Sequence, residues 1–120
     1  MSMLRWVTYL GPGLLTVQIP DDFELHARPA VLIARVVQHH GTPVELDIDG
    51  RACLPGSIID LLIHFHSAGH ARQLVFRGPD STLRDLCALF EHDLGERGLS
   101  AMPPELDFLR RLGDGGEHEA

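Results

Sequence analysis

The chain has 120 residues, 44% of them hydrophobic, and a formal net charge of −7 from 17 acidic and 10 basic residues, the latter all arginine. This length and composition predict one domain with a modest core and exclude an intrinsically disordered chain. The acidic balance argues against nucleic acid as a partner, because binding nucleic acid requires a basic face.

The sequence shows no sign of membrane insertion or of a disulfide framework. No segment approaches the roughly 20 apolar residues of a membrane span, and residues 1–11 lack the apolar region of a signal peptide. Cys53 and Cys87 have no C-x-x-C spacing, so buried free thiols are favoured over a disulfide. We therefore expect a cytoplasmic protein, with residues 1–13 as an N-terminal extension.

The first elements expected are a strand over 14–19 and a helix from Ala27 to about His40. Pro29 fits the first turn of that helix because it has no N–H group and its φ is fixed near the helical value. Apolar residues recur at helical spacing after it, and Gly41 stops the helix.

Turn and cap signals define the rest of the domain. Asp49-Gly50 predicts a hairpin turn, Ser57 is expected to cap a helix, and Asp80 or Ser81 to cap the next. The elements expected are strands over 43–48, 51–54 and 73–77 and helices over 58–65 and 82–94. The order βαββαβα predicts an α+β fold with one layer of helices on one face of a largely antiparallel sheet. Residues 98–120 are expected to be a partly mobile C-terminal extension with a short helix over 104–112.

His26 lies immediately before the first expected helix. The unpaired N–H groups and the positive dipole end at a helix N-terminus favour an anion. A neutral imidazole is nucleophilic near pH 7, and Arg28 adds a cation whose planar fork suits phosphate oxygens. The junction fits a histidine that carries a phosphoryl group; an ordinary helix cap with a surface arginine is the other interpretation.

Two sequence landmarks and the element order resemble the histidine-containing phosphocarrier (HPr) family of the bacterial sugar phosphotransferase system. Leu25-His26-Ala27-Arg28-Pro29-Ala30 matches the active-site signature of that family. The segment 50–59 resembles its second landmark, a turn and short strand that lead to a serine at the start of the second helix. The resemblance covers residues 14–97 and implies an HPr-like open-faced sandwich with a four-stranded antiparallel sheet.

The resemblance also implies a stoichiometric phosphoryl carrier and not an enzyme. His26 would accept a phosphoryl group from phosphorylated enzyme I and pass it to a IIA-type component, in sugar uptake or in regulation. Arg28 and the backbone N–H of Ala27 would hold the phosphoryl oxygens. Ser57 matches the serine that a dedicated kinase phosphorylates in some bacteria, although a plain helix cap is an equal interpretation. The residues that match the family's apolar docking face are Ile58, Ile59 and Leu62.

Some positions depart from the family pattern. Glu24 stands where the family usually has a glycine, and Asp60 lies in the helix after Ser57 where many relatives have basic or small residues. These departures support an alternative function, a non-catalytic HPr-like regulatory binding module that acts through the Ser57 helix.

The remaining histidines favour surface positions over a metal site, and metal binding through the cluster around His64 is the less favoured interpretation. His64-x-His66 is not an i,i+4 pair, and no nearby cysteine completes a zinc set. We therefore expect His64, His66 and His70 to be surface histidines on a loop. We expect no metal and no cofactor. The protein is expected to be a monomer.

Overall fold

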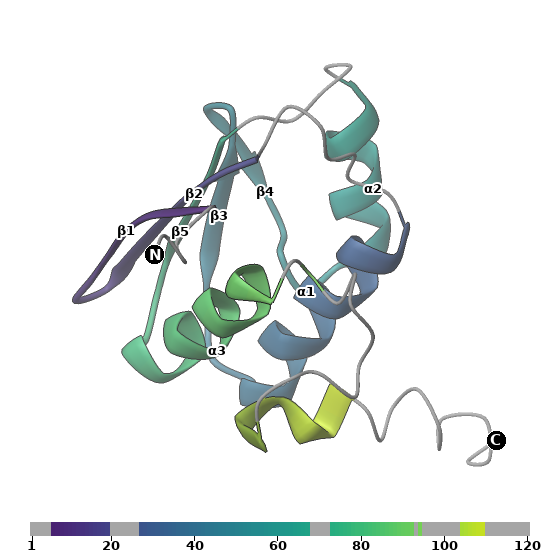
Figure 1. Ribbon diagram of the computed structural model, residues 1–120. Helices are drawn as coiled ribbons and strands as arrows, with labels where there is room; N and C mark the ends of the chain where they lie inside the picture. Colours follow the sequence, from purple (N-terminus) through teal and green to yellow (C-terminus); the bar gives the residue numbers. More distant parts are fainter. Residues whose placement is uncertain (1–5, 20–26, 68–72, 93, 95–103, 110–120) are drawn as a thin grey trace, which may run out of the picture.

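The computed structural model describes residues 6–19, 27–67, 73–92, 94 and 104–109 (Figure 1). Its elements, in chain order, are β1 (Val7–Gly11), β2 (Leu14–Gln18), α1 (Ala27–His40), β3 (Glu45–Ile48), β4 (Arg51–Cys53), α2 (Ile58–Ser67), β5 (Gln73–Arg77), α3 (Asp80–Glu91) and the short 3₁₀ helix η3 (Pro104–Leu106). From β2 to α3 the elements follow one another as βαββαβα.

The strands form one antiparallel sheet in the order β1-β2-β5-β3-β4. The prediction of four strands is wrong, because β1 adds a fifth from the segment assigned to the N-terminal extension. Apart from Val7, the residues of β1 are exposed or half-buried, so this strand has no alternating apolar pattern. Pairing with β2 and the neighbouring Trp6, which is only 1% exposed, hold it in place.

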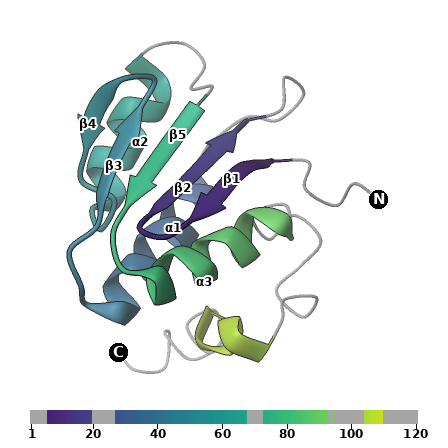
Figure 2. The same cartoon turned by 90° about the vertical axis from the view of Figure 1, so that its left-hand side faces the viewer.

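The core lies between one face of the sheet and the helices. Phe76 of β5 is paired with Leu15 of β2 on one side and with Leu46 of β3 on the other, and all three are buried. Figures 1 and 2 show α1, α2 and α3 on the same side of the sheet. The predicted α+β class and the single layer of helices are therefore confirmed.

Helix α1 has the predicted bounds. Pro29 is buried in its first turn, and the following apolar residues face the core. The helix ends where Gly41 adopts φ +67° and its N–H donates to the carbonyl of Val37 at 3.1 Å. A left-handed residue of this kind commonly ends a helix, and glycine takes the conformation without a steric penalty.

The hairpin of β3 and β4 forms at the predicted turn. Asp49 and Gly50 have φ values of 51° and 87°, as a two-residue type I′ connection requires. The next helix, α2, extends two residues beyond its expected end, to Ser67.

Helix α3 is capped differently from the prediction. Its N-cap is Pro79 without a side-chain capping bond, and the helix ends at Glu91 instead of residue 94. The Asp80 carboxylate instead accepts a hydrogen bond from the Gly13 N–H at 2.8 Å. This side chain therefore connects the start of α3 to the turn between β1 and β2.

Residues 104–109 of the expected C-terminal extension pack on the core. Leu106 and Leu109 are buried, and the Phe108 ring stacks on His39 with ring centroids 3.8 Å apart. The expected helix over 104–112 is observed in part, as η3 and one further turn, while its last residues lie outside the described part. No helix among the described residues is both long and apolar enough to cross a membrane.

Candidate functional site

The start of α1 is the site that the sequence predicts. His26 and Glu24 lie outside the described residues, and α1 begins at Ala27, the next residue after His26. Ala27 and Arg28 are exposed, whereas Pro29 is buried and anchors the first turn. The N–H groups of Ala27 and Arg28 belong to the first turn, so the helix itself supplies no carbonyl for them.

The described residues in the first turn of α1 favour an anion by their charge. The first turn of α1 contains no acidic residue. Among the described residues, no carboxylate lies within ion-pair distance of Arg28. The helix end and the guanidinium can therefore act together on a negatively charged group.

Ser57 is the N-cap of α2, as predicted. Its Oγ accepts a hydrogen bond from the Asp60 N–H at 3.1 Å, and its own N–H donates to the Leu54 carbonyl at 3.1 Å. The preceding residue, Gly56, accepts a hydrogen bond from Gln38 Nε2 at 2.7 Å. The last turn of α1 therefore fixes the loop that leads into α2.

The structure separates the three residues expected to form a docking face. Ile58 and Leu62 are partly buried against the core, and only Ile59 is well exposed, at 71%. Ile63, one turn further along α2, is 56% exposed, and Leu54 before the helix is also exposed. The exposed apolar side chains here are thus Ile59, Ile63 and Leu54; the i,i+4 spacing of the two isoleucines could have identified that pair.

A second cluster joins the end of β4 to α2. Cys53 Sγ, a carboxylate oxygen of Asp60 and a ring nitrogen of His64 all lie within 4.8 Å of one another. The Asp60 carboxylate also accepts a hydrogen bond from the Leu54 N–H at 2.8 Å. The loop assignment of His64 and His66 is wrong, because both belong to α2, and His70 lies outside the described residues. The i,i+4 spacing of Asp60 and His64 is visible in the sequence, but the approach of Cys53 depends on tertiary packing.

Burial and hydrogen bonding shift the pKa values in this cluster in opposite directions. Burial, with help from the neighbouring Asp60, raises the pKa of the Cys53 thiol to about 12. The Leu54 N–H, followed by the Cys53 thiol and His64, lowers the pKa of Asp60. The thiol is therefore protonated at neutral pH and donates to an ionised carboxylate. Both Cys53 and Cys87 are free and buried, as predicted.

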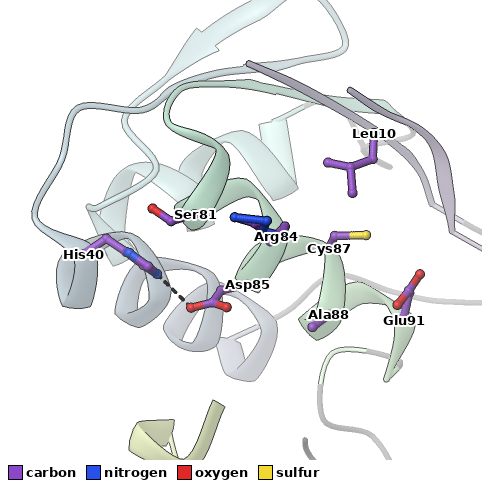
Figure 3. Close-up of a pocket in the computed structure, with 8 residues that line it drawn as sticks. All are labelled: Leu10, His40, Ser81, Arg84, Asp85, Cys87, Ala88 and Glu91. Carbon is purple, nitrogen blue, oxygen red and sulfur yellow. Dashed lines mark hydrogen bonds and ion pairs between the residues drawn. The ribbon is translucent and has the colours of Figure 1, made fainter. Parts of the chain in front are cut away.

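An open hollow of about 530 Å³ lies over the outer side of α3 (Figure 3). His40 Nε2 and Asp85 Oδ2 are 2.8 Å apart on its wall, and the dashed line in Figure 3 marks this pair. Arg84 and Leu10, the latter from β1, also line it. The sequence gives no sign of this hollow because it forms only once β1, α1 and α3 are packed together.

Comparison with known proteins leaves these sites without an assigned role. No protein-family model matches the chain, and no curated protein is significantly similar to it in sequence.

Proposed function

We propose that the chain is a stoichiometric phosphoryl carrier of the HPr type, in which His26 accepts a phosphoryl group from phosphorylated enzyme I and passes it to a IIA-type component. One observation carries the proposal: α1 begins at Ala27, directly after His26, with Arg28 exposed and no acidic residue in the first turn. Such a helix start stabilises the roughly two negative charges of a phosphoryl group.

The architecture supports the same proposal. The order βαββαβα from β2 to α3, with helices on one face of an antiparallel sheet, matches the order of elements in that family. In this proposal β1 and η3 are additions to the family domain, and the carrier works as a monomer in the cytoplasm.

The transfer step exchanges one nitrogen–phosphorus bond for another. A ring nitrogen of neutral His26 attacks phosphorus, and the bond to the donor's histidine nitrogen breaks. The donor ring takes up one proton to become neutral imidazole, and the phosphorylated His26 ring loses one from its other nitrogen, so the protons balance. Arg28 and the N–H groups of Ala27 and Arg28 hold the phosphoryl oxygens. The protein contributes position and electrostatic stabilisation, while the phosphohistidine remains reactive enough to be passed on.

Labelling the full chain with enzyme I and labelled phosphoenolpyruvate tests the proposal. We expect acid-labile label on the wild type, none on His26→Ala, and transfer slowed about tenfold or more in Arg28→Ala, since a charge-assisted contact contributes about 1.5–3 kcal/mol. His66→Gln, an exposed histidine of α2, is the control and should be labelled like the wild type. An unlabelled wild type, or equal label on His26→Ala, would contradict the proposal.

The exposed apolar side chains of α2 support a second candidate, a regulatory binding module without phosphotransfer through His26. Ile59 and Ile63 are exposed one turn apart, in the helix that Ser57 caps. A kinase acting on Ser57 would add a phosphate at this helix N-terminus, where the dipole favours it.

A pull-down from the native cytoplasm with the full chain separates the two functions. The regulatory module predicts partners outside the phosphotransferase system that are lost in the double variant Ile59→Ser, Ile63→Ser. Recovery of phosphotransferase components alone, unaffected by that double variant, would exclude the regulatory module.

A further inference from the structure

The cluster of Cys53, Asp60 and His64 brings together three kinds of metal-ligand atom. Sulfur, carboxylate oxygen and imidazole nitrogen all lie within 4.8 Å of one another. Cys53 is the last residue of β4, and Asp60 and His64 lie one turn apart on α2, so two regular elements position the three side chains. We propose that they form a binding site for a zinc-type divalent cation.

Hydrogen bonds already orient two of these side chains. The Leu54 N–H donates to Asp60 Oδ2 at 2.8 Å, and the Nδ1–H of His64 donates to the Asp60 carbonyl at 2.9 Å. His64 Nδ1 is also 3.7 Å from Asp60 Oδ2. Coordination through Nδ1 therefore requires the neutral ring to carry its proton on Nε2, and the hydrogen bond to the Asp60 carbonyl is then given up. The Leu54 N–H that orients the Asp60 carboxylate is a backbone hydrogen bond of the kind that commonly orients metal ligands.

The spacing is close to that of a bound ion. Zinc bond lengths of about 2.0–2.3 Å place tetrahedral ligand atoms about 3.5 Å apart, so donors that lie within 4.8 Å of one another need to approach by about 1.3 Å at most. The Asp60 and His64 side chains are 29% and 19% exposed, which leaves them room to adjust and gives an ion access from solvent. Cys53 is the buried member that fixes the inner side of the site.

The donor set selects the class of ion. Thiolate and imidazole favour zinc and its neighbours among the transition metals, whereas Mg²⁺ and Ca²⁺ prefer sites made of oxygen. On binding, the Cys53 S–H proton is released to solvent and a sulfur–metal bond forms. One thiolate and one carboxylate then balance the two positive charges of the ion. Three protein ligands leave the fourth tetrahedral position to water.

Titration of the metal-free full chain with Co²⁺, followed by competition with Zn²⁺, tests the site. We expect one equivalent of Co²⁺ to produce a thiolate-to-cobalt charge-transfer band, which Zn²⁺ abolishes. Cys53→Ser should remove the band, and His64→Gln should weaken Co²⁺ binding at least tenfold. Circular dichroism checks that each variant is folded. If Cys53→Ser is unfolded, the Co²⁺ affinity of His64→Gln decides whether the site exists.

Matched controls separate this cluster from other cysteines and histidines. Cys87→Ser removes the other buried thiol, and His66→Gln removes an exposed histidine of the same helix. Both should bind Co²⁺ like the wild type, and so should His26→Ala, since this site does not depend on phosphotransfer. Absence of the band in the wild type, or unchanged binding in His64→Gln, would overturn the proposal.

Discussion

Each of the two cysteines has a carboxylate next to its buried thiol. The reactivity of each thiol should therefore change only when its own neighbouring carboxylate is replaced. Burial and Asp60 raise the pKa of Cys53 to about 12, and burial and Glu91 raise the pKa of Cys87 to about 11. Because the thiolate is the reactive form, both should alkylate slowly at pH 8 in the folded, metal-free protein. We expect Asp60→Asn to speed alkylation of Cys53 several-fold and to leave Cys87 unchanged.

Glu91→Gln is the matched variant and should speed alkylation of Cys87 while leaving Cys53 unchanged. Mass spectrometry after timed exposure to iodoacetamide distinguishes the two sites, with a denatured sample as the fully reactive reference. Equal acceleration of both cysteines by either variant would indicate general loosening of the fold and contradict the local explanation.

Asp60 should also make stability depend on pH. Its pKa in the folded chain lies below the ordinary value of 3.8, chiefly because of the Leu54 N–H. Its contribution is therefore complete above the unfolded pKa and is lost as pH falls through the lower folded pKa. Urea unfolding should show Asp60→Asn less stable than the wild type at pH 7, with the difference shrinking below about pH 4.

Glu45→Gln, at an exposed carboxylate of β3, provides the comparison for that measurement. It should follow the wild-type profile closely at all pH values. A constant stability difference between Asp60→Asn and the wild type down to pH 2 would mean that the charge of Asp60 is not responsible.

The N-termini of α2 and α3 should differ in how much stability is lost when a serine there is replaced by alanine. Ser57 caps α2 through a hydrogen bond from the Asp60 N–H, while α3 has no side-chain capping bond. Ser57→Ala should cost about 1 kcal/mol of unfolding free energy, the usual value of such a cap. Ser81→Ala, an exposed serine in the first turn of α3, should change stability by less than about 0.5 kcal/mol. Chemical denaturation measures both, and equal losses would contradict the capping argument.

The elements between β2 and α3 could be predicted because local signals bound them. Gly41, Asp49-Gly50 and Ser57 require particular backbone conformations or hydrogen bonds at the ends of elements, and the structure has them there. The strand β1 could not be predicted, because its residues do not alternate and pairing with β2 determines its conformation. The α3 cap was wrong because Asp80 bonds to Gly13 across the fold.

The candidate sites also differ in how far local sequence signals predict them. The start of α1 after His26 follows from Pro29 and helical periodicity, which are local features of the sequence. The approach of Cys53 to Asp60 and His64 follows from how β4 packs against α2, which no short window of sequence contains. The exposure of the expected docking residues was only partly predicted, because the choice between Ile58 and Ile59 depends on which side of α2 faces the core.

The hydrophobic core extends beyond residues 14–97, the segment that resembles the phosphocarrier family. Trp6 lies beside Phe90 of α3, with ring centroids 6.0 Å apart, so the N-terminal segment closes one side of the core. The C-terminal residues 104–109 contribute two buried leucines and the Phe108 ring that stacks on His39 of α1. The parts before and after the resembling segment therefore contribute to the stability of the domain.

The C-terminal contribution can be measured with single substitutions. Leu109 is 1% exposed, and Leu109→Ala removes a buried side chain and leaves a cavity, at a cost of about 2–5 kcal/mol. Leu54→Ala, at a leucine that is 68% exposed, is the matched control and should cost less than about 0.5 kcal/mol. Urea denaturation of both variants gives the comparison. If Leu109→Ala were as stable as Leu54→Ala, residues 104–109 would not be part of the cooperative core in solution. A loss of the expected size would instead mean that residues 104–109 stabilise the same fold that positions α1 and the proposed phosphorylation site.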